Sequence, residues 1–307
     1  MKNLSSDEKK VDRRQFMLNS TLAAGAAAGL LTARTNMVEA APKRNIIKSL
    51  KFGMIQPKDK KASIEDKLRV AKEAGFASVE PNTIFRATDL AKFSAGAEKV
   101  GIEIDAIVCS THWGKPLTDP DPEIYEQTIK GMRTSMLNVK DLGGDMVLLV
   151  PAVVNENVGY EVAWKRAVER TKMLAEDAER LNVTIGIENV WNKFLLSPLE
   201  ARAFIDEIDS KFVKFWFDVG NVVQFAYPED WIRTLGGDRI ARVDVKDFKR
   251  EGNQWKELGK GSVDWTAVMT AFDEIGYEGY FAAEVSGGDK DYLIEAVSKP
   301  MDRFIAL

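Results

Sequence analysis

The stretch Val213-Lys214-Phe215-Trp216-Phe217-Asp218 is a mostly apolar run of strand length that ends in an acidic residue. Such runs recur along the chain from about Leu50, and longer segments of helical period separate them, as expected for repeated βα units around a parallel sheet. Eight units predict the α/β class and a closed (β/α)8 TIM barrel, which typically needs about 250 residues. The expected strands are Leu50–Ile55, Ser78–Glu80, Ile102–Cys109, Met146–Val150, Val183–Glu188, Val213–Asp218, Ile240–Val245 and Tyr280–Glu284.

The segments between these runs carry helix signals. Ser63, with Asp66 three residues later, suits an N-terminal cap, and Gly75 suits the end of that helix. An open doubly wound sheet is the alternative fold, but no Gly-x-Gly-x-x-Gly turn follows the first strand. No linker divides the chain, so residues 42–307 are expected to form one domain. Further helices are expected at Tyr160–Leu181, Pro198–Ile208, Trp265–Ile275 and Tyr292–Ile305.

Residues 1–41 differ from the rest of the chain. Asp12-Arg13-Arg14-Gln15-Phe16-Met17 precedes an Ala-, Gly- and Leu-rich run from Leu22 to Leu31, which resembles a twin-arginine signal peptide. Val38-Glu39-Ala40 offers small residues for cleavage, and the apolar run is too short to span a bilayer. We therefore expect a periplasmic or otherwise exported protein without a stable membrane anchor after cleavage. An uncleaved anchor or a disordered tail is the alternative.

The net charge of the mature chain limits its partners, and its cysteine content limits its covalent cross-links. Residues 1–41 hold six of the 43 Lys and Arg and four of the 47 Asp and Glu, so the remainder carries a net charge of −6. A surplus of acidic residues argues against a nucleic-acid partner. Cys109 is the single cysteine, which excludes an internal disulfide. The sequence leaves assembly into a homo-oligomer open.

Acidic residues stand at or near the ends of five expected strands, where barrel enzymes place their active sites. Clustered buried carboxylates repel one another and lose hydration, so a divalent cation is the simplest way to stabilise them. Oxygen ligands favour Mg²⁺ or Mn²⁺ over zinc. Ion pairs with lysine or arginine are the structural alternative. The five acids are Glu80, Glu188, Asp218, Asp244 and Glu284.

The residues around four of these acids resemble the sugar phosphate isomerase/epimerase family, which has a xylose-isomerase-like TIM barrel. The matching segments, in the family's order, are Ile187-Glu188-Asn189-Val190-Trp191-Asn192-Lys193-Phe194, Phe217-Asp218-Val219-Gly220-Asn221, Val243-Asp244-Val245-Lys246-Asp247-Phe248 and Ala283-Glu284-Val285. The resemblance covers nearly all of residues 50–307. It implies that Glu188, Asp218, Asp244 and Glu284 hold a divalent metal, most often Mn²⁺, with Mg²⁺ as the other candidate.

Two positions depart from the family pattern. Asp244 stands where the third ligand is commonly histidine, and Asn221 stands where a supporting histidine is common. Four carboxylates carry more charge than one divalent ion balances, so we expect Lys246 and Arg242 to help. The alternative is a site that has lost its metal and only binds a ligand.

Loops after the strands supply further candidates for substrate contact. His112, the single histidine, follows the third strand and is a candidate acid or base, and its neighbour Trp113 offers a flat wall for a sugar ring. Lys246 is a candidate to bind a substrate oxygen or to stabilise an enolate. A hydrogen-bonded loop histidine, an ion-paired lysine and a packed tryptophan are the alternatives. Glu80, Asn189, Trp191 and Asn221 complete the predicted substrate-binding set.

A metal that bridges neighbouring carbonyl and hydroxyl oxygens eases removal of the proton between them through an enediolate. The resemblance implies that Glu188 and Glu284 remove and return this proton on opposite faces of the sugar. We therefore predict an isomerase or epimerase of a free keto-sugar or sugar derivative. The alternatives are a 3-keto-glycoside lyase that works by β-elimination and a sugar-binding barrel without catalysis.

Overall fold

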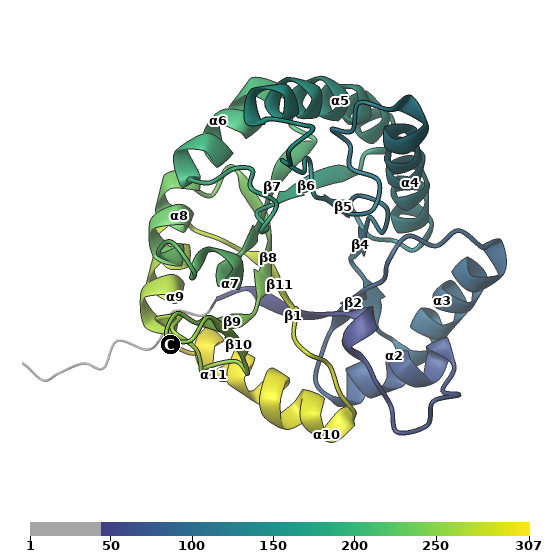
Figure 1. Ribbon diagram of the computed structural model, residues 1–307. Coiled ribbons are helices and arrows are strands. Elements are labelled where there is room, and N and C mark those ends of the chain that lie inside the picture. The colour runs from purple at the N-terminus through teal and green to yellow at the C-terminus, as the bar shows by residue number, and fades with distance from the viewer. Residues whose placement is uncertain (1–43) are drawn as a thin grey trace, which may run out of the picture. The chain divides into compact units, whose positions relative to one another are not determined.

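A computed structural model describes residues 44–307, and the predicted signal peptide with its cleavage site lies outside the described residues. A single parallel sheet curves into a barrel, and helices surround it (Figure 1). The predicted barrel fold is therefore confirmed. The strands of the sheet are β1 (Ile46–Lys51), β2 (Ser78–Glu80), β3 (Glu103–Ile104), β4 (Ala106–Val108), β5 (Met146–Leu149), β6 (Thr184–Glu188), β7 (Val213–Asp218), β8 (Ile240–Val245) and β11 (Gly279–Ala283).

The third expected strand is divided into two, so the described sheet has nine strands where eight were expected. β3 pairs with β2, whereas β4 pairs with β5. The change of neighbour falls at Asp105, whose buried carboxylate accepts hydrogen bonds from the Ser49 and Ser78 hydroxyls. A parallel bridge between Asn82 and Val108 then closes the barrel.

The first strand lies earlier than expected. It spans Ile46–Lys51, not Leu50–Ile55, because Ile46 to Leu50 pair with β11. The chain then leaves the ladder in a 3₁₀ turn at Phe52–Met54. The consequence for the site is that Lys51 becomes the carboxyl end of β1.

The helices follow their sequence signals closely. Ser63 caps α2 in a reciprocal capping box with Asp66, as predicted. The last expected helix is helical throughout, but its middle part, Leu293–Ser298, is a π-helix that lies just before Pro300, which has no amide proton to donate. The helices are α2 (Ile64–Glu73), α3 (Ala87–Val100), α4 (Pro122–Asp141), α5 (Tyr160–Leu181), α6 (Pro198–Ile208), α7 (Val219–Val222), α8 (Pro228–Leu235), α9 (Trp265–Glu274), α10 (Lys290–Tyr292) and α11 (Lys299–Ile305).

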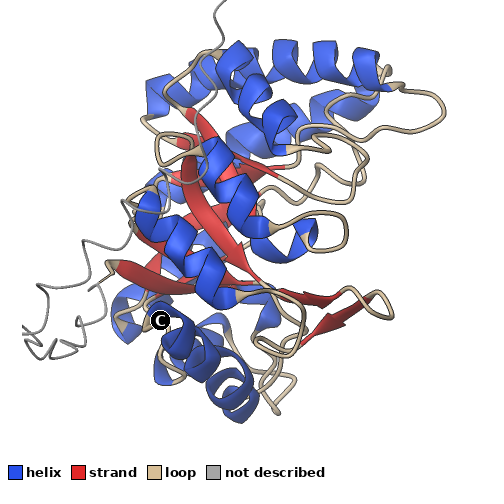
Figure 2. Ribbon diagram, turned by 90° about the vertical axis from the view of Figure 1, so that its left-hand side faces the viewer, coloured by secondary structure: helices blue, strands red, loops and turns tan. Residues whose placement is uncertain are grey.

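Two apolar layers hold the barrel together. The larger lies between the sheet and the surrounding helices, which Figure 2 shows on both sides of the strands. The smaller fills the barrel interior, where Trp216 packs with Ala106, Met146 and Leu148. In the described part of the chain, no helix is long and apolar enough to cross a membrane.

A hairpin that the sequence did not suggest follows β8. It consists of β9 (Asp247–Lys249) and β10 (Gln254–Lys256), which pair antiparallel. Figure 2 shows the hairpin projecting from the end of the barrel toward which the strands point. It therefore adds a wall to the face where the predicted site lies.

Candidate metal centre

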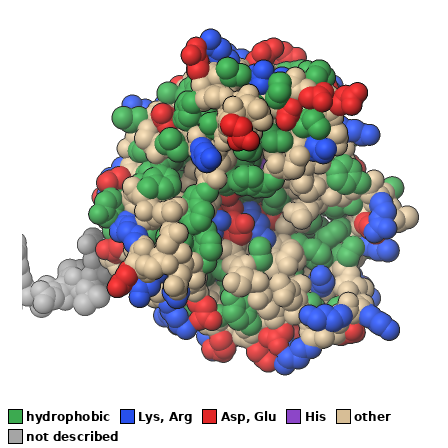
Figure 3. Space-filling model, viewed as in Figure 1, with side chains coloured by type: hydrophobic (Ala, Val, Ile, Leu, Met, Phe, Trp, Pro, Cys, Tyr) green, Lys and Arg blue, Asp and Glu red, His purple; other side chains and the backbone are tan. Residues whose placement is uncertain are grey.

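The four predicted ligands lie together at the carboxyl ends of the strands. Glu188 and Asp218 end β6 and β7, Asp244 lies in β8, and Glu284 directly follows β11. One carboxylate oxygen of each lies within 4.8 Å of the others. In Figure 3, acidic and basic side chains line a hollow at the centre of this face, with hydrophobic side chains around it.

Strand register explains why separate parts of the chain meet here. Asp218 and Asp244 are direct partners in the β7–β8 ladder, so their side chains point the same way, into the barrel. Glu284 continues the ladder, since its amide donates to the Val245 carbonyl. Glu188, Asp218 and Asp244 are buried, and the Glu284 side chain is 33% exposed.

Burial and crowding shift the pKa values of these acids. Loss of hydration, with the neighbouring negative charges, raises the pKa of Asp218 to about 7 despite the opposing effect of Lys246. The same two causes raise the pKa of Glu188 and of Asp244. Burial would also raise the pKa of Glu284, but Lys246 and Lys51 outweigh it and lower that pKa. A bound cation would relieve the repulsion that these shifts report.

Lys246 lies in the cluster, as predicted. Its Nζ is 2.8 Å from Asp218 Oδ2 and 2.7 Å from Glu284 Oε2. Gly220 makes room for this side chain, because a Cβ there would lie 2.4 Å from Lys246 Cγ. The lysine therefore links two of the predicted metal ligands.

Lys51 is a second buried cation that the sequence analysis missed. Its Nζ lies 2.5 Å from Glu80 Oε2 and 2.9 Å from Asp244 Oδ1, and 4.4 Å above the Trp216 ring. Burial lowers the pKa of Lys51, but Asp244 and Glu80 outweigh burial and raise it. Burial raises the pKa of Glu80 to about 8. Glu80 is therefore placed beside the predicted metal ligands as a partner of Lys51.

The donor set fits a hard divalent cation. Five acids meet two lysines, which leaves a formal charge of −3 when all are ionised. Among the described residues, Asp244 Oδ2 is buried without a hydrogen-bond partner, and such an orphan oxygen is costly unless a cation binds it. All four ligand atoms are carboxylate oxygens, which suit Mn²⁺ or Mg²⁺.

Two asparagines hold the strand ends around Asp218. Asn189 accepts from the Asp218 amide at 2.8 Å and donates to the Asp218 carbonyl at 2.9 Å. Asn221 donates its backbone N–H to Asp218 Oδ1 at 2.7 Å, and its side chain donates to the Asn189 carbonyl at 2.8 Å. These two predicted substrate residues thus position Asp218, and their amide groups are engaged with protein.

His112 lies in the wall of the site in its neutral form. Its Nδ1 accepts the Val150 amide at 3.1 Å, which leaves the proton on Nε2. Burial lowers the pKa of His112 to about 3. This geometry favours a hydrogen-bond donor, while its predicted role in proton transfer stays a prediction.

A cavity of about 300 Å³ opens onto these residues. Trp113, which is half exposed, lines the cavity, and its contact with a sugar ring stays a prediction. Glu188, Asp244 and Glu284 line the cavity, whereas Asp218 is not among the residues that line it. The residues that line it are Lys51, Gly53, Met54, Glu80, Asn82, Val108, Cys109, Ser110, His112, Trp113, Leu148, Glu188, Asp244 and Glu284.

Residues 68–300 match the family described as the xylose isomerase-like TIM barrel. The chain belongs to this family. L-ribulose-5-phosphate 3-epimerase UlaE of Escherichia coli (strain K12 / DH10B) is 22% identical over 255 residues, which are 77% of this chain and 87% of that protein.

Solved structures share the fold. A D-tagatose 3-epimerase-like protein has a TM-score of 0.72 at 17% identity, and the match covers 84% of this chain and 98% of that chain. The 3-keto-D-glucoside 4-epimerase YcjR from E. coli has a TM-score of 0.69 at 16% identity, over 86% of this chain and all of that chain. These likenesses establish the xylose isomerase-like barrel.

Aromatic side chains extend the site beyond the carboxylates. Trp191 is 42% exposed, and its indole N–H donates to the Asn221 carbonyl at 2.8 Å. Its ring stacks on Trp255 of β10 at a centroid distance of 5.0 Å, and Phe248 packs edge-on against both. The unexpected hairpin therefore supplies an aromatic wall beside the metal centre.

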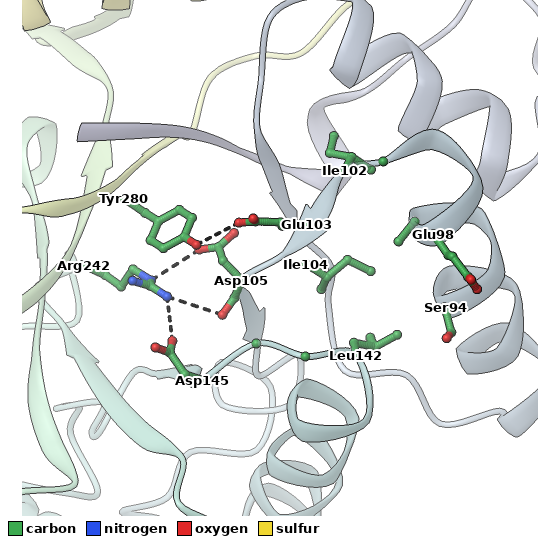
Figure 4. Close-up of a pocket in the computed structure, with 14 residues that line it drawn as sticks. Ser94, Glu98, Ile102, Glu103, Ile104, Asp105, Leu142, Asp145, Arg242 and Tyr280 are labelled. Atoms are coloured by element: carbon green, nitrogen blue, oxygen red, sulfur yellow. Dashed lines mark hydrogen bonds and ion pairs between the residues drawn. The ribbon is translucent and has the colours of Figure 1, made fainter. Parts of the chain in front are cut away.

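Arg242 does not balance the metal site, contrary to our expectation. Arg242 lies two residues before Asp244 on β8, so its side chain reaches the opposite end of the barrel. There it pairs with Asp105 at 3.3 Å and Asp145 at 2.7 Å and lies over the Tyr280 ring (Figure 4). This group lines a separate cavity of about 550 Å³ at the amino ends of the strands, where barrels are usually stabilised rather than catalytic.

Gly287 and Gly288 bind the first loop of the barrel. Gly288 exchanges backbone hydrogen bonds with Gln56 and Met54. Gly287 has a φ of +78°, and a Cβ there would lie 2.7 Å from the Met54 carbonyl oxygen. These two glycines therefore allow the backbone at Met54 and Gln56 to come close.

Proposed function

We propose that this protein is a divalent-metal-dependent sugar epimerase or isomerase that acts on a free keto-sugar or sugar derivative. The observation that carries the proposal is the position of Glu188 and Glu284. Both belong to the four-carboxylate cluster and both line the cavity. The family and its sugar-epimerase relatives support the same class.

Residues of the chain have separate roles in the proposed reaction. Glu188 and Glu284 act as the two carboxylates that take a proton from the sugar carbon and return it. Lys246, held by Asp218 and Glu284, supplies positive charge where an oxyanion develops. His112 donates a hydrogen bond from Nε2 to the substrate. A divalent ion bound by Glu188, Asp218, Asp244 and Glu284 would supply Lewis acidity to the substrate oxygens.

The cavity favours an unphosphorylated sugar. In the described part of the chain, Lys51 is the one lysine or arginine that lines it, and Glu80 and Asp244 already engage its ammonium group. A phosphate there would face four acidic side chains, Glu80, Glu188, Asp244 and Glu284. The proposed substrate is therefore a neutral polyol with a carbonyl group.

The test is exchange of substrate C–H protons with D₂O when Mn²⁺ is supplied, with free ketoses and 3-keto-glycosides as substrates. The proposal expects deuterium at the carbon next to the carbonyl, an epimer or isomer as product, and loss of both in Glu188→Gln and Glu284→Gln. Aglycone release without an epimer would instead support the β-elimination alternative. Ligand binding without exchange would support the sugar-binding barrel.

Export by the twin-arginine route is a separate proposal, supported by Arg13 and Arg14 ahead of the apolar run. The expected result is a periplasmic mature protein that begins near Ala41. Replacement of both arginines by lysine should retain the protein in the cytoplasm. Unchanged export of that variant would overturn the proposal.

A further inference from the structure

The hairpin β9–β10 brings a tryptophan to the lysine of the metal centre. Phe248 and Trp255 are direct partners in the ladder of this hairpin. Lys246 lies two residues before Phe248, which places it diagonal to Trp255 and within reach of a long side chain. The two side chains meet, because Lys246 Nζ lies over the Trp255 ring at 5.1 Å from its centroid. This distance is typical of a cation–π interaction.

This contact closes a ring of five residues around one predicted metal ligand. Asp218 Oδ1 accepts the backbone N–H of Asn221, whose carbonyl accepts the indole N–H of Trp191. Trp191 stacks on Trp255 with an angle of 23° between the rings. Trp255 contacts Lys246, whose Nζ returns to Asp218 Oδ2 at 2.8 Å. The hairpin is therefore linked to both carboxylate oxygens of Asp218.

The Trp255 ring acts on a buried ammonium group. The Lys246 side chain is 14% exposed, whereas Trp255 is 45% exposed. Asp218 and Glu284 engage two of the three N–H groups of the ammonium. At 5.1 Å the ring attracts the positive charge without taking a hydrogen bond. The third N–H therefore stays available for a substrate oxygen.

We propose that Trp255 is a positioning residue that holds the Lys246 ammonium group at Asp218 and Glu284 for the developing oxyanion of the substrate. The inference rests on the proposed function, in which Lys246 supplies positive charge to that oxyanion. Trp255 acts through Lys246, since it is not among the residues that line the cavity at the metal centre. Its loss should therefore slow the chemical step and leave substrate binding unchanged.

Kinetics of ketose epimerisation with Mn²⁺ test this role. Trp255→Leu should lower kcat about tenfold, the effect of losing a cation–π contact shielded from water, and KM should stay within about twofold of wild type. Trp255→Phe keeps an aromatic face and should recover most of kcat. Tyr227→Leu is the matched control, because the Tyr227 ring contacts Arg250 in the turn of the same hairpin, with the guanidinium carbon 4.4 Å from the ring centroid.

A second measurement needs neither substrate nor metal. In NMR spectra of the full chain with ¹³C-labelled lysine in EDTA, the Trp255 ring current should displace the ε-methylene signals of Lys246 from the usual lysine position. Lys246→Arg assigns these signals by removing them. The displacement should persist in Trp255→Phe and vanish in Trp255→Leu.

A higher KM at unchanged kcat in Trp255→Leu would make Trp255 a substrate contact and overturn the positioning role. Equal losses of kcat in Trp255→Leu and Tyr227→Leu, or no recovery in Trp255→Phe, would also overturn it. So would Lys246 signals at the usual lysine position in the wild-type protein. If the wild-type protein turns over no ketose, the proposed function fails, and the NMR measurement alone decides whether Trp255 holds Lys246.

Discussion

The ammonium nitrogen of Lys51 lies 2.9 Å from Asp244 Oδ1, although their strands are not neighbours. β11 stands between β1 and β8 in the sheet. The ion pair therefore passes β11 inside the barrel and includes one of the predicted metal ligands. Because Lys51 contacts Oδ1, Asp244 Oδ2 stays buried without a hydrogen-bond partner.

Replacing Lys51 with methionine should destabilise the metal-free protein by about 3–5 kcal/mol, because the buried Glu80 and Asp244 would lose the ammonium group that both contact. The free energy of unfolding in urea with EDTA measures the effect. Lys48→Met is the matched control on the same strand, since Lys48 pairs with the exposed Asp302 and should cost about 1 kcal/mol or less. Equal losses in the two variants would contradict the role of Lys51.

The stability of the metal-free protein should fall as pH rises from about 5.5 to 8. Burial raises the pKa of Asp218 to about 7 and of Glu80 to about 8. The folded state therefore holds protons that the unfolded state has already lost, and its stability decreases until both acids are ionised in the folded state. Each such proton contributes up to about 1.4 kcal/mol per pH unit.

Urea unfolding at several pH values in EDTA measures this slope. Asp218→Asn removes one of the titrating groups and should make the slope shallower. Because Mn²⁺ competes with the same protons, its affinity for the wild-type protein should weaken as pH falls below about 7. A stability that does not fall over this range would contradict the prediction, since it would show that these carboxylates are already ionised in the folded protein.

Asn189→Ala should weaken Mn²⁺ binding about 10- to 100-fold, the usual effect of removing a group that orients a metal ligand. The amide side chain bonds both the N–H and the carbonyl of Asp218, so its loss frees the end of β7. Asn192→Ala is the control, since Asn192 is also buried but donates to the Ala152 carbonyl. If Asn189→Ala binds Mn²⁺ as tightly as Asn192→Ala does, Asn189 does not support the metal centre.

The sequence was sufficient to predict the strand ends and thus the four acids, because each acid follows its own apolar run. It was not sufficient for Lys51, which the local pattern placed inside a strand starting at Leu50. Pairing of Ile46 to Leu50 with β11 places β1 earlier in the chain, and register with β2 sets Lys51, the last residue of β1, opposite Glu80. Arg242 was wrongly expected at the metal site for a related reason. Its position along β8, two residues before Asp244, decides which end of the barrel its side chain reaches, and the local sequence pattern does not show which distant residues it meets there.

Titration of the full chain with Mn²⁺, followed by calorimetry, tests the four-carboxylate centre most directly. Wild-type protein should bind one ion per chain at the centre, and Asp244→Ala and Asp218→Asn should each abolish or greatly weaken that binding. Glu103→Gln, which alters an acid at the other end of the barrel, should leave it intact. Wild-type protein that binds no Mn²⁺, or the two aspartate variants binding it as tightly as wild type, would contradict the metal centre.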